Sequence, residues 1–221
     1  MEKSQISELV NPLEVIANRV NTFLTETIKE EGEALRQVDI WRSQGFKIVV
    51  TEGCFDLAHR QHGAYLLACK YLVDDGGKLM VMVDTDELMM RRKNKKPINP
   101  VSDRMAQIAE YRPVDLVTKK SFTGFEWIKT VRPDIIVRST TTGSDSMSEG
   151  LNMLFEFIDE NNLETQVVVF DTKFNIIPAQ EAFRKGIEYE DNKTNEISST
   201  NIKQKIIDGS KGLVDLSKYP I

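Results

Sequence analysis

The feature that most constrains this chain is the stretch Lys47–Gly63, where an apolar run, a glycine turn, two histidines and a helical pattern follow one another. The run Ile48–Val50 predicts a buried strand that turns at Gly53, and helical spacing of apolar residues begins near His59 and His62. The backbone N–H groups that open a helix have no partner within the helix and attract anions. Two imidazoles beside them therefore predict an anion site, most often one for phosphate.

Short apolar runs and helical patterns alternate along the chain from Lys47 onward. Strands are predicted over 47–51, 78–84, 114–118, 134–138 and 166–170, and helices over 60–73, 102–111, 124–131, 147–161 and 199–208. This alternation is typical of an α/β fold, here a Rossmann-like, doubly wound, mostly parallel five-stranded sheet with helices on both faces. Ligands of such sheets bind beyond the carboxyl ends of the strands, so we expect the histidines, Asp84 and Arg138 to meet at one edge.

The chain is expected to divide into a helical extension over residues 1–44, an α/β domain over 45–208 and a tail over 209–221. Pro12 suits the first position of a helix capped by Asn11, and a second helix is predicted over 31–43. The first of these helices carries an apolar stripe, formed by Leu13, Ile16, Val20, Leu24 and Ile28. The stripe must pack against the domain or against a second copy of the chain, and both possibilities stay open.

Composition narrows the class of protein. Of the 221 residues, 40% are hydrophobic and 29% are charged, which predicts a well-packed core. The net charge of −5 disfavours general nucleic-acid binding, and no apolar run approaches the roughly 20 residues that span a membrane. The first residues lack the apolar core of a signal peptide, and the two cysteines, Cys54 and Cys69, form no CxxC pair. We therefore expect a cytoplasmic protein whose partners include neither nucleic acid nor membrane.

The segment Gly53–His62, with the sequence GCFDLAHRQH, resembles the Gly-x-Phe-Asp-x-x-His-x-Gly-His signature of the cytidylyltransferase-like nucleotidyltransferases. The preceding WRSQGFKIVVTEG is similar to the entry of the adenylyltransferase domain of sugar-phosphate enzymes, notably the heptose-1-phosphate adenylyltransferases. One position departs from the signature, because Gln61 stands where the family has a glycine that lets the nucleotide lie close to the backbone.

The resemblance assigns roles to this segment. His59 and His62 are expected to be catalytic, because imidazole donors stabilise the charge that grows on the α-phosphate and on the leaving pyrophosphate. Asp56 is expected to bind the substrate, as is Asp84 after the second strand. The residues implied in nucleotide binding are Gly53, Cys54 and Phe55.

A run of cations, Arg91–Lys96, follows the second predicted strand, and five of its six residues are basic. A basic loop in an acidic protein can neutralise the triphosphate and the substrate phosphate together. The PINP sequence that follows is similar to sugar-phosphate adenylyltransferases, whereas KNKK is similar to the lysine loop of glycerol-3-phosphate cytidylyltransferases. The resemblance implies a catalytic Lys93 and a phosphate-binding Lys96, with Arg92 and Lys95 as open alternatives.

Three further segments agree with the family in type and in order along the chain. Arg104 corresponds to an arginine that supports the phosphate site and is expected to be catalytic, and Arg112 is expected to bind the substrate. Arg138, at the end of a predicted strand, is assigned to the nucleotide, although Ser139 and its neighbours replace the family's Lys-Gly-Gly-Asp loop. Hydroxyl residues before the last predicted helix resemble an Ile-Ser-Thr-Thr motif that binds β- and γ-phosphates, and they are Ser198, Ser199 and Thr200.

The resemblance implies an enzyme that transfers AMP or CMP from ATP or CTP to a phosphorylated small metabolite such as a sugar phosphate, with release of pyrophosphate. Mg²⁺ is expected with the triphosphate, and a homodimer is expected from the family and from the apolar stripe. The departures at Gln61 and after Arg138 leave open a catalytically inactive nucleotide-binding or assembly module of the same fold. A dinucleotide-dependent dehydrogenase is disfavoured, because no Gly-x-Gly-x-x-Gly follows the first strand.

Overall fold

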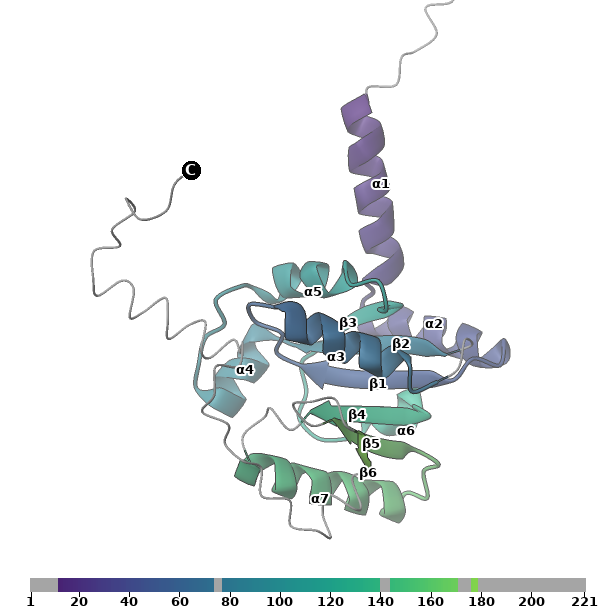
Figure 1. Ribbon diagram of the computed structural model, residues 1–221, viewed down its shortest axis with the longest axis vertical. Helices are drawn as coiled ribbons and strands as arrows, with labels where there is room; N and C mark the ends of the chain where they lie inside the picture. Colours follow the sequence, from purple (N-terminus) through teal and green to yellow (C-terminus); the bar gives the residue numbers. More distant parts are fainter. Residues whose placement is uncertain (1–11, 74–76, 140–143, 171–175, 179–221) are drawn as a thin grey trace, which may run out of the picture.

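The computed structural model describes residues 12–73, 77–139, 144–170 and 176–178. In this part of the chain, a six-stranded sheet has the order β3-β2-β1-β4-β5-β6 (Figure 1). The strands are β1 (Ile48–Gly53), β2 (Lys78–Asp84), β3 (Leu116–Lys120), β4 (Ile135–Ser139), β5 (Gln166–Phe170) and β6 (Ile176–Pro178). The first five are parallel, which confirms the predicted α/β fold with a mostly parallel sheet. β6 pairs antiparallel to β5 and is a sixth strand that was not predicted.

The central strands are apolar because helices cover both of their faces. Ile48, Val49 and Val50 of β1 are all fully buried. Successive side chains of a strand point to opposite faces, so Ile48 and Val50 enter one hydrophobic core and Val49 enters the other. A short apolar run without polar alternation is therefore the expected pattern for a strand at the middle of this sheet.

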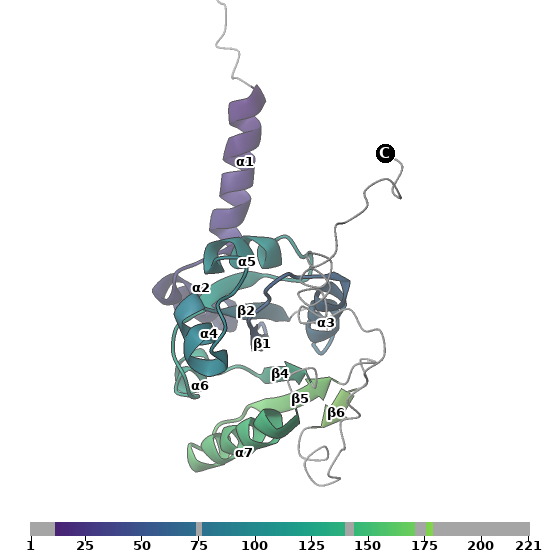
Figure 2. The same cartoon turned by 90° about the vertical axis from the view of Figure 1, so that its left-hand side faces the viewer.

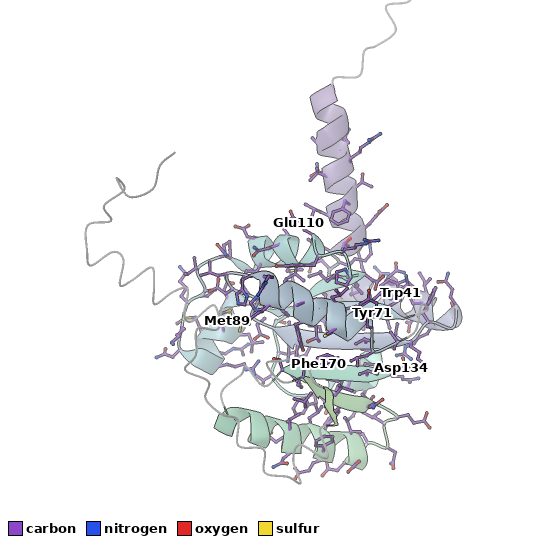
Figure 3. The ribbon with its side chains drawn as sticks, in the orientation of Figure 1. Trp41, Tyr71, Met89, Glu110, Asp134 and Phe170 are labelled. Atoms are coloured by element: carbon purple, nitrogen blue, oxygen red, sulfur yellow. The ribbon has the colours of Figure 1, made fainter. Side chains whose placement is uncertain are left out.

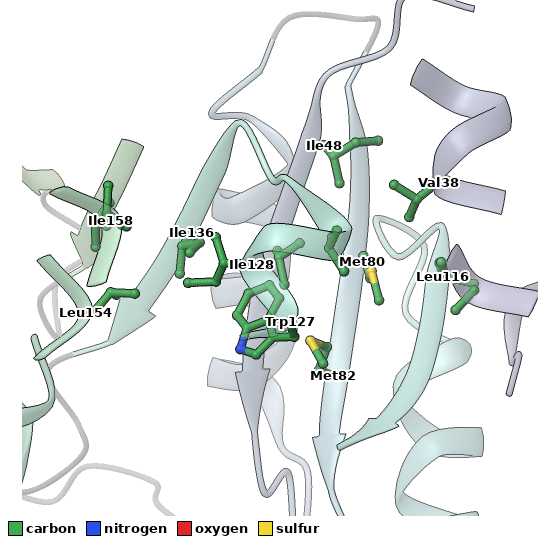
Figure 4. Close-up of a cluster of buried hydrophobic side chains, with 14 of the residues drawn as sticks. Val38, Ile48, Met80, Met82, Leu116, Trp127, Ile128, Ile136, Leu154 and Ile158 are labelled. Carbon is green, nitrogen blue, oxygen red and sulfur yellow. The ribbon is translucent and has the colours of Figure 1, made fainter. Parts of the chain in front are cut away.

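In the described part of the chain, five helices follow β1 and surround the sheet (Figure 2). They are α3 (Arg60–Lys70), α4 (Asp86–Lys93), α5 (Val101–Ala109), α6 (Trp127–Val131) and α7 (Ser144–Glu160). α3 and α5 contribute to the core that contains Val49, whereas α6 and α7 contribute to the core that contains Val50. Figure 4 shows this second core, where Trp127 of α6 lies near Met82 of β2.

Among the described residues, two helices precede the sheet, α1 (Pro12–Thr27) and α2 (Glu31–Ser43). α1 begins at Pro12 as expected, and α2 covers the predicted range 31–43. α2 is part of the second core, because Ala34, Val38 and Trp41 are buried there with the side chains of α6 and α7. A helical extension separate from the α/β domain was expected over residues 1–44, but the burial of these three residues makes α2 part of the core of that domain.

α1 projects away from the body of the molecule and meets it only near its last turn (Figure 1). Leu24 and Ile28 pack against the core of α3 and α5, and Ile28 forms an isolated bridge with Val117 at the edge strand β3. Val20 and Phe23 are about half exposed. The C-terminal end of the apolar stripe therefore packs against the domain, and a homodimer stays a prediction. None of the helices within the described ranges is long and apolar enough to cross a lipid bilayer.

The two ends of the strands have different surroundings. Figure 3 shows Asp134 and Met89 on opposite sides of the molecule, the first where the strands begin and the second in α4, beyond their carboxyl ends. At the amino end, the Asp134 carboxylate accepts the backbone N–H of Ile48 at 2.7 Å and joins β4 to β1. The carboxyl end is the edge at which ligands of this fold class bind.

α4 was not predicted, and it converts half of the expected basic loop into helix. Thr85 caps it by accepting the N–H of Leu88 at 3.2 Å, and Asn94 ends it in a left-handed conformation. Arg91 and Arg92 therefore lie on the last turn of a helix, while Lys95 follows it in a loop. The helix was missed because its polar residues outnumber the two side chains, Leu88 and Met89, that enter the interior.

The packing of α2 leads to a stability prediction. Val38 is 1% exposed, whereas Ile40 on the same helix is 50% exposed. Val38→Ala should lower the free energy of unfolding by about 2 kcal/mol, because it leaves a cavity in the core. Ile40→Ala is the matched control and should change it by less than about 0.5 kcal/mol. Equal urea midpoints for the two variants would show that α2 is not part of the cooperative core.

Candidate active site

The two histidines lie side by side where the β1 loop enters α3. His59 is the residue before the helix, and its ring centroid is 4.1 Å from that of His62 in the first turn. Nδ1 of His62 accepts the backbone N–H of His59 at 3.2 Å. A neutral imidazole that accepts at Nδ1 carries its proton on Nε2, so His62 keeps an N–H donor for a ligand.

Both imidazoles are held in the neutral form. Burial lowers the pKa of His62 to about 4, with a smaller contribution from the neighbouring His59. Burial also lowers the pKa of His59, and its buried Nδ1 has no hydrogen-bond partner within the described residues. At neutral pH the pair therefore offers N–H donors without carrying positive charge, and an arriving anion would favour protonation.

The glycine and the phenylalanine of the signature have a steric explanation. Phe55 adopts a left-handed backbone conformation with φ of 49°, which folds its ring back over the end of β1. A Cβ atom at Gly53 would lie 3.2 Å from this ring, closer than ordinary packing allows. The ring of Phe55 meets His62 edge-on, with centroids 5.6 Å apart. These two residues therefore hold the second histidine in place, and their predicted contacts with a nucleotide stay predictions.

Arg104 joins the loops that build this edge. Its guanidinium is fully buried, with Nε donating to the Asn99 carbonyl at 3.0 Å and Nη2 donating to the Asp84 carbonyl at 2.8 Å. Nη2 also pairs with Asp86 at 2.6 Å, and Nη1 donates to the carbonyl of Cys54. A catalytic, phosphate-supporting role was expected for Arg104, but protein acceptors occupy its side chain. The structure thus gives it a positioning role.

Asp56 acts in the same way on the PINP segment. Its carboxylate is buried and accepts the backbone N–H groups of Ile98 at 3.0 Å and Asn99 at 3.2 Å. These bonds fix the loop between α4 and α5 against the loop that follows β1. Substrate binding was expected for Asp56, and the structure instead shows its carboxylate engaged with this loop.

Asp84, at the end of β2, meets the β1 loop and the basic helix. One carboxylate oxygen, Oδ2, accepts the Cys54 thiol at 3.3 Å and lies 3.4 Å from the guanidinium of Arg92. The other oxygen, Oδ1, is buried and has no hydrogen-bond partner within the described residues. Cys54 and Asp84, both predicted site residues, are therefore brought together, and among the described side chains of the basic run Arg92 reaches Asp84.

A buried ion cluster that was not predicted completes this edge. Glu52 of β1 pairs with both Lys120 of β3 and Arg138 of β4, and the side chains of Glu52 and Lys120 are about 5% exposed. Burial raises the pKa of the Glu52 carboxyl, but the charges of Arg138 and Lys120 outweigh this effect and hold the pKa below its ordinary value. Charged residues at the ends of otherwise apolar strands were the available signal for Glu52 and Lys120.

The remaining predicted residues are not brought to the histidines by the described structure. Lys96 and Arg112 are exposed, and Gln61 is half-buried in the first turn of α3. The side chain of Lys93 lies outside the described part of the structure, as do the last predicted helix and three predicted phosphate ligands, Ser198, Ser199 and Thr200. Their roles stay predictions. Within the described ranges, no three acidic, histidine or cysteine side chains cluster as metal ligands would.

The lowered pKa of His62 leads to a prediction for stability against pH. An unfolded chain with a histidine pKa near 6.5 binds a proton more readily than the folded chain, so acid favours unfolding. Between pH 6.5 and pH 4 the His62 contribution to the free energy of unfolding should fall by about 3 kcal/mol. His62→Gln removes this contribution, so its stability should decline less over this range in urea titrations at stepped pH. Parallel curves for the two proteins would contradict the buried neutral imidazole.

Comparisons with known proteins agree with the sequence signature. The family model described as cytidylyltransferase-like matches residues 50–205. Among curated proteins, the bifunctional protein HldE of Gluconacetobacter diazotrophicus is 32% identical over 125 residues, which cover 56% of this chain and 25% of that protein. HldE of Alkalilimnicola ehrlichii is 39% identical over 123 residues, which cover 55% of this chain and 24% of that protein. HldE of Alcanivorax borkumensis is 31% identical over 145 residues, which cover 65% of this chain and 29% of that protein.

The chain spans about a quarter of the length of the curated relatives it matches. Among solved structures, a lipopolysaccharide core biosynthesis protein from Thermoplasma volcanium is 28% identical and has a TM-score of 0.48, with 57% of this chain and 96% of that chain covered. The family match extends over well more than half of the 221 residues and includes the histidine pair and the Arg104 contacts. The chain therefore belongs to the cytidylyltransferase-like family.

Proposed function

We propose that this protein transfers a nucleotidyl group, AMP or CMP, from a nucleoside triphosphate to a sugar phosphate and releases pyrophosphate. The observation that carries the proposal is the histidine pair, whose neutral imidazoles lie at the start of α3 and at the carboxyl edge of a parallel sheet. Backbone N–H groups and imidazole N–H groups at one point suit the growing negative charge of a phosphoryl transition state.

The reaction needs no covalent intermediate with the protein. An oxygen of the acceptor phosphate attacks the α-phosphorus, a new P–O bond forms, and the bond between the α-phosphorus and the bridging oxygen breaks. The electron pair leaves with pyrophosphate, and no general base is needed, because the acceptor phosphate is already ionised at neutral pH. His59 and His62 donate to phosphoryl oxygens, and each gains affinity for a proton as negative charge develops beside it.

Two further assignments complete the proposal. Mg²⁺ is expected to accompany the triphosphate, because it binds phosphate oxygens while keeping most of its waters. ATP is the first nucleotide to test, since the entry to β1 and the PINP segment are similar to adenylyltransferases, and CTP is the alternative. The ion pair with Asp84 holds Arg92 at the carboxyl edge of the sheet. Among the described cations of the basic run, Arg92 is therefore the best placed to meet a phosphate.

A pyrophosphate-release assay with ATP or CTP and a panel of sugar phosphates tests this function. His59→Ala and His62→Ala should each lower kcat about 100-fold, because each removes a donor to the transition state. Tyr71→Ala is the matched control, since Tyr71 is 77% exposed just beyond the other end of α3 and should leave the rate unchanged. Nucleotide binding without pyrophosphate release on any acceptor would favour an inactive binding module. Full activity of both histidine variants would contradict the mechanism.

A further inference from the structure

Four neighbouring strands carry a charged residue at their last or last but one position, on the same face of the sheet. Lys120 and Asp84 are the last residues of β3 and β2, and Glu52 and Arg138 are the last but one of β1 and β4. Each lies an even number of positions after a core residue of its strand, and these core residues are Leu116, Met82, Val50 and Ile136. Even spacing on a strand keeps side chains on one face. This row, termed here the charged edge, lies on the face covered by α6 and α7, the opposite face from that of α3.

The charged edge carries more cations than carboxylates. Glu52 pairs with both Lys120 and Arg138, while Asp84 pairs with Arg92 from α4. Three cations therefore face two carboxylates among the described residues, which leaves one positive charge in excess. The nearby pair of Arg104 and Asp86 adds no net charge.

Three buried polar atoms on the same face have no hydrogen-bond partner among the described residues. They are Oδ1 of Asp84, Oγ1 of Thr118 and Nε1 of Trp127, on residues that are 2%, 1% and 6% exposed. Thr118 precedes Lys120 by two positions on β3 and shares its face. In Figure 4 the indole nitrogen of Trp127 lies on the side of the ring nearer the strand arrowheads. The face therefore offers one free acceptor and two groups that can donate, all near the end of the sheet that binds ligands.

Fold stability alone does not explain this composition. Buried ion pairs add little to stability compared with apolar side chains of the same volume, and a buried charge without a counterion opposes folding. Unpartnered buried donors and acceptors also oppose folding. An anionic ligand with hydroxyl groups would neutralise the excess charge and satisfy the free polar atoms at once.

We propose that the charged edge binds the acceptor substrate, a polyhydroxylated compound with a phosphate group, whose anionic group meets Arg138 and Lys120 and whose hydroxyls meet Asp84. Arg138, which the resemblance assigns to the nucleotide, belongs to the acceptor in this proposal. This inference rests on the proposed function and names the acceptor subsite within it. Glu52 is a positioning residue, because it holds both cations from its place on the central strand. The chain continues from β1 to β2 on one side and from β4 to β5 on the other side, so the topological switch point of the sheet lies between β1 and β4. The subsite therefore borders this switch point, next to the loop that carries the histidines.

Phosphate binding tests the proposal with single-charge variants. Inorganic phosphate is titrated by calorimetry into the protein alone and into the protein saturated with a non-hydrolysable ATP or CTP analogue. Lys120→Met and Arg138→Met should each weaken phosphate binding to the nucleotide-loaded protein at least tenfold and change nucleotide affinity less than twofold. Lys119→Met is the matched control, because Lys119 neighbours Lys120 on β3, pairs with Glu30 and should leave both affinities unchanged.

The outcomes separate this proposal from the proposed function. Phosphate affinities like that of the wild-type protein in both variants would overturn the subsite, as would a parallel loss of nucleotide affinity, which would assign the cations to the triphosphate. If the wild-type protein binds no nucleotide, the proposed function fails. Phosphate binding that both variants weaken would still support an anion subsite at the charged edge.

Thermal unfolding gives a second readout that does not depend on any ligand. Lys120→Met and Arg138→Met each leave Glu52 with one counterion, so they should keep or raise the melting temperature. Glu52→Gln leaves two neighbouring cations without a carboxylate, so its melting temperature should lie clearly below those of the two methionine variants. A melting temperature for Glu52→Gln equal to theirs would contradict the excess of positive charge.

Discussion

The candidate active site depends on the burial of a single guanidinium. Arg104 donates to the carbonyls of Cys54 after β1, Asp84 at the end of β2 and Asn99 after α4, and it pairs with Asp86 at the start of α4. A buried arginine is tolerated only when its donors find acceptors, so the loops must take the positions that supply them. The same contacts place the histidine loop, Asp84 and the PINP segment at one edge. A buried arginine whose donors face protein acceptors can thus determine where the loops of the candidate site are held.

Burial affects the ionisation of the titratable groups differently on the two sides of this edge. Around His59 and His62, burial keeps the imidazoles neutral and leaves N–H donors for an anion. Around Glu52, burial is outweighed by two cations, and the carboxylate stays ionised. A protein of net negative charge therefore gathers donors and cations at the carboxyl ends of its strands. This distribution suits a reaction in which two phosphate-bearing substrates meet.

The sequence predicted the strands and the histidine pair well, for a physical reason. Apolar runs such as Ile48–Val50 have few alternatives to a buried strand, and the spacing of His59 and His62 fixes them on one turn. Contacts between distant segments could not be predicted in this way. Glu52 meets a lysine 68 positions further along the chain, and only the strand order brings the two together. The burial of Arg104 could not be predicted for the same reason, because its acceptors come from segments that are far apart in the sequence.

The role of the histidine pair can be tested by a crystal structure of the protein with a non-hydrolysable ATP or CTP analogue and Mg²⁺. Phosphate oxygens are expected within hydrogen-bond distance of the imidazoles of His59 and His62, at the start of α3. Arg104 is expected to keep its carbonyl partners when the nucleotide is bound. A triphosphate bound elsewhere, or histidines turned away from it, would contradict the account.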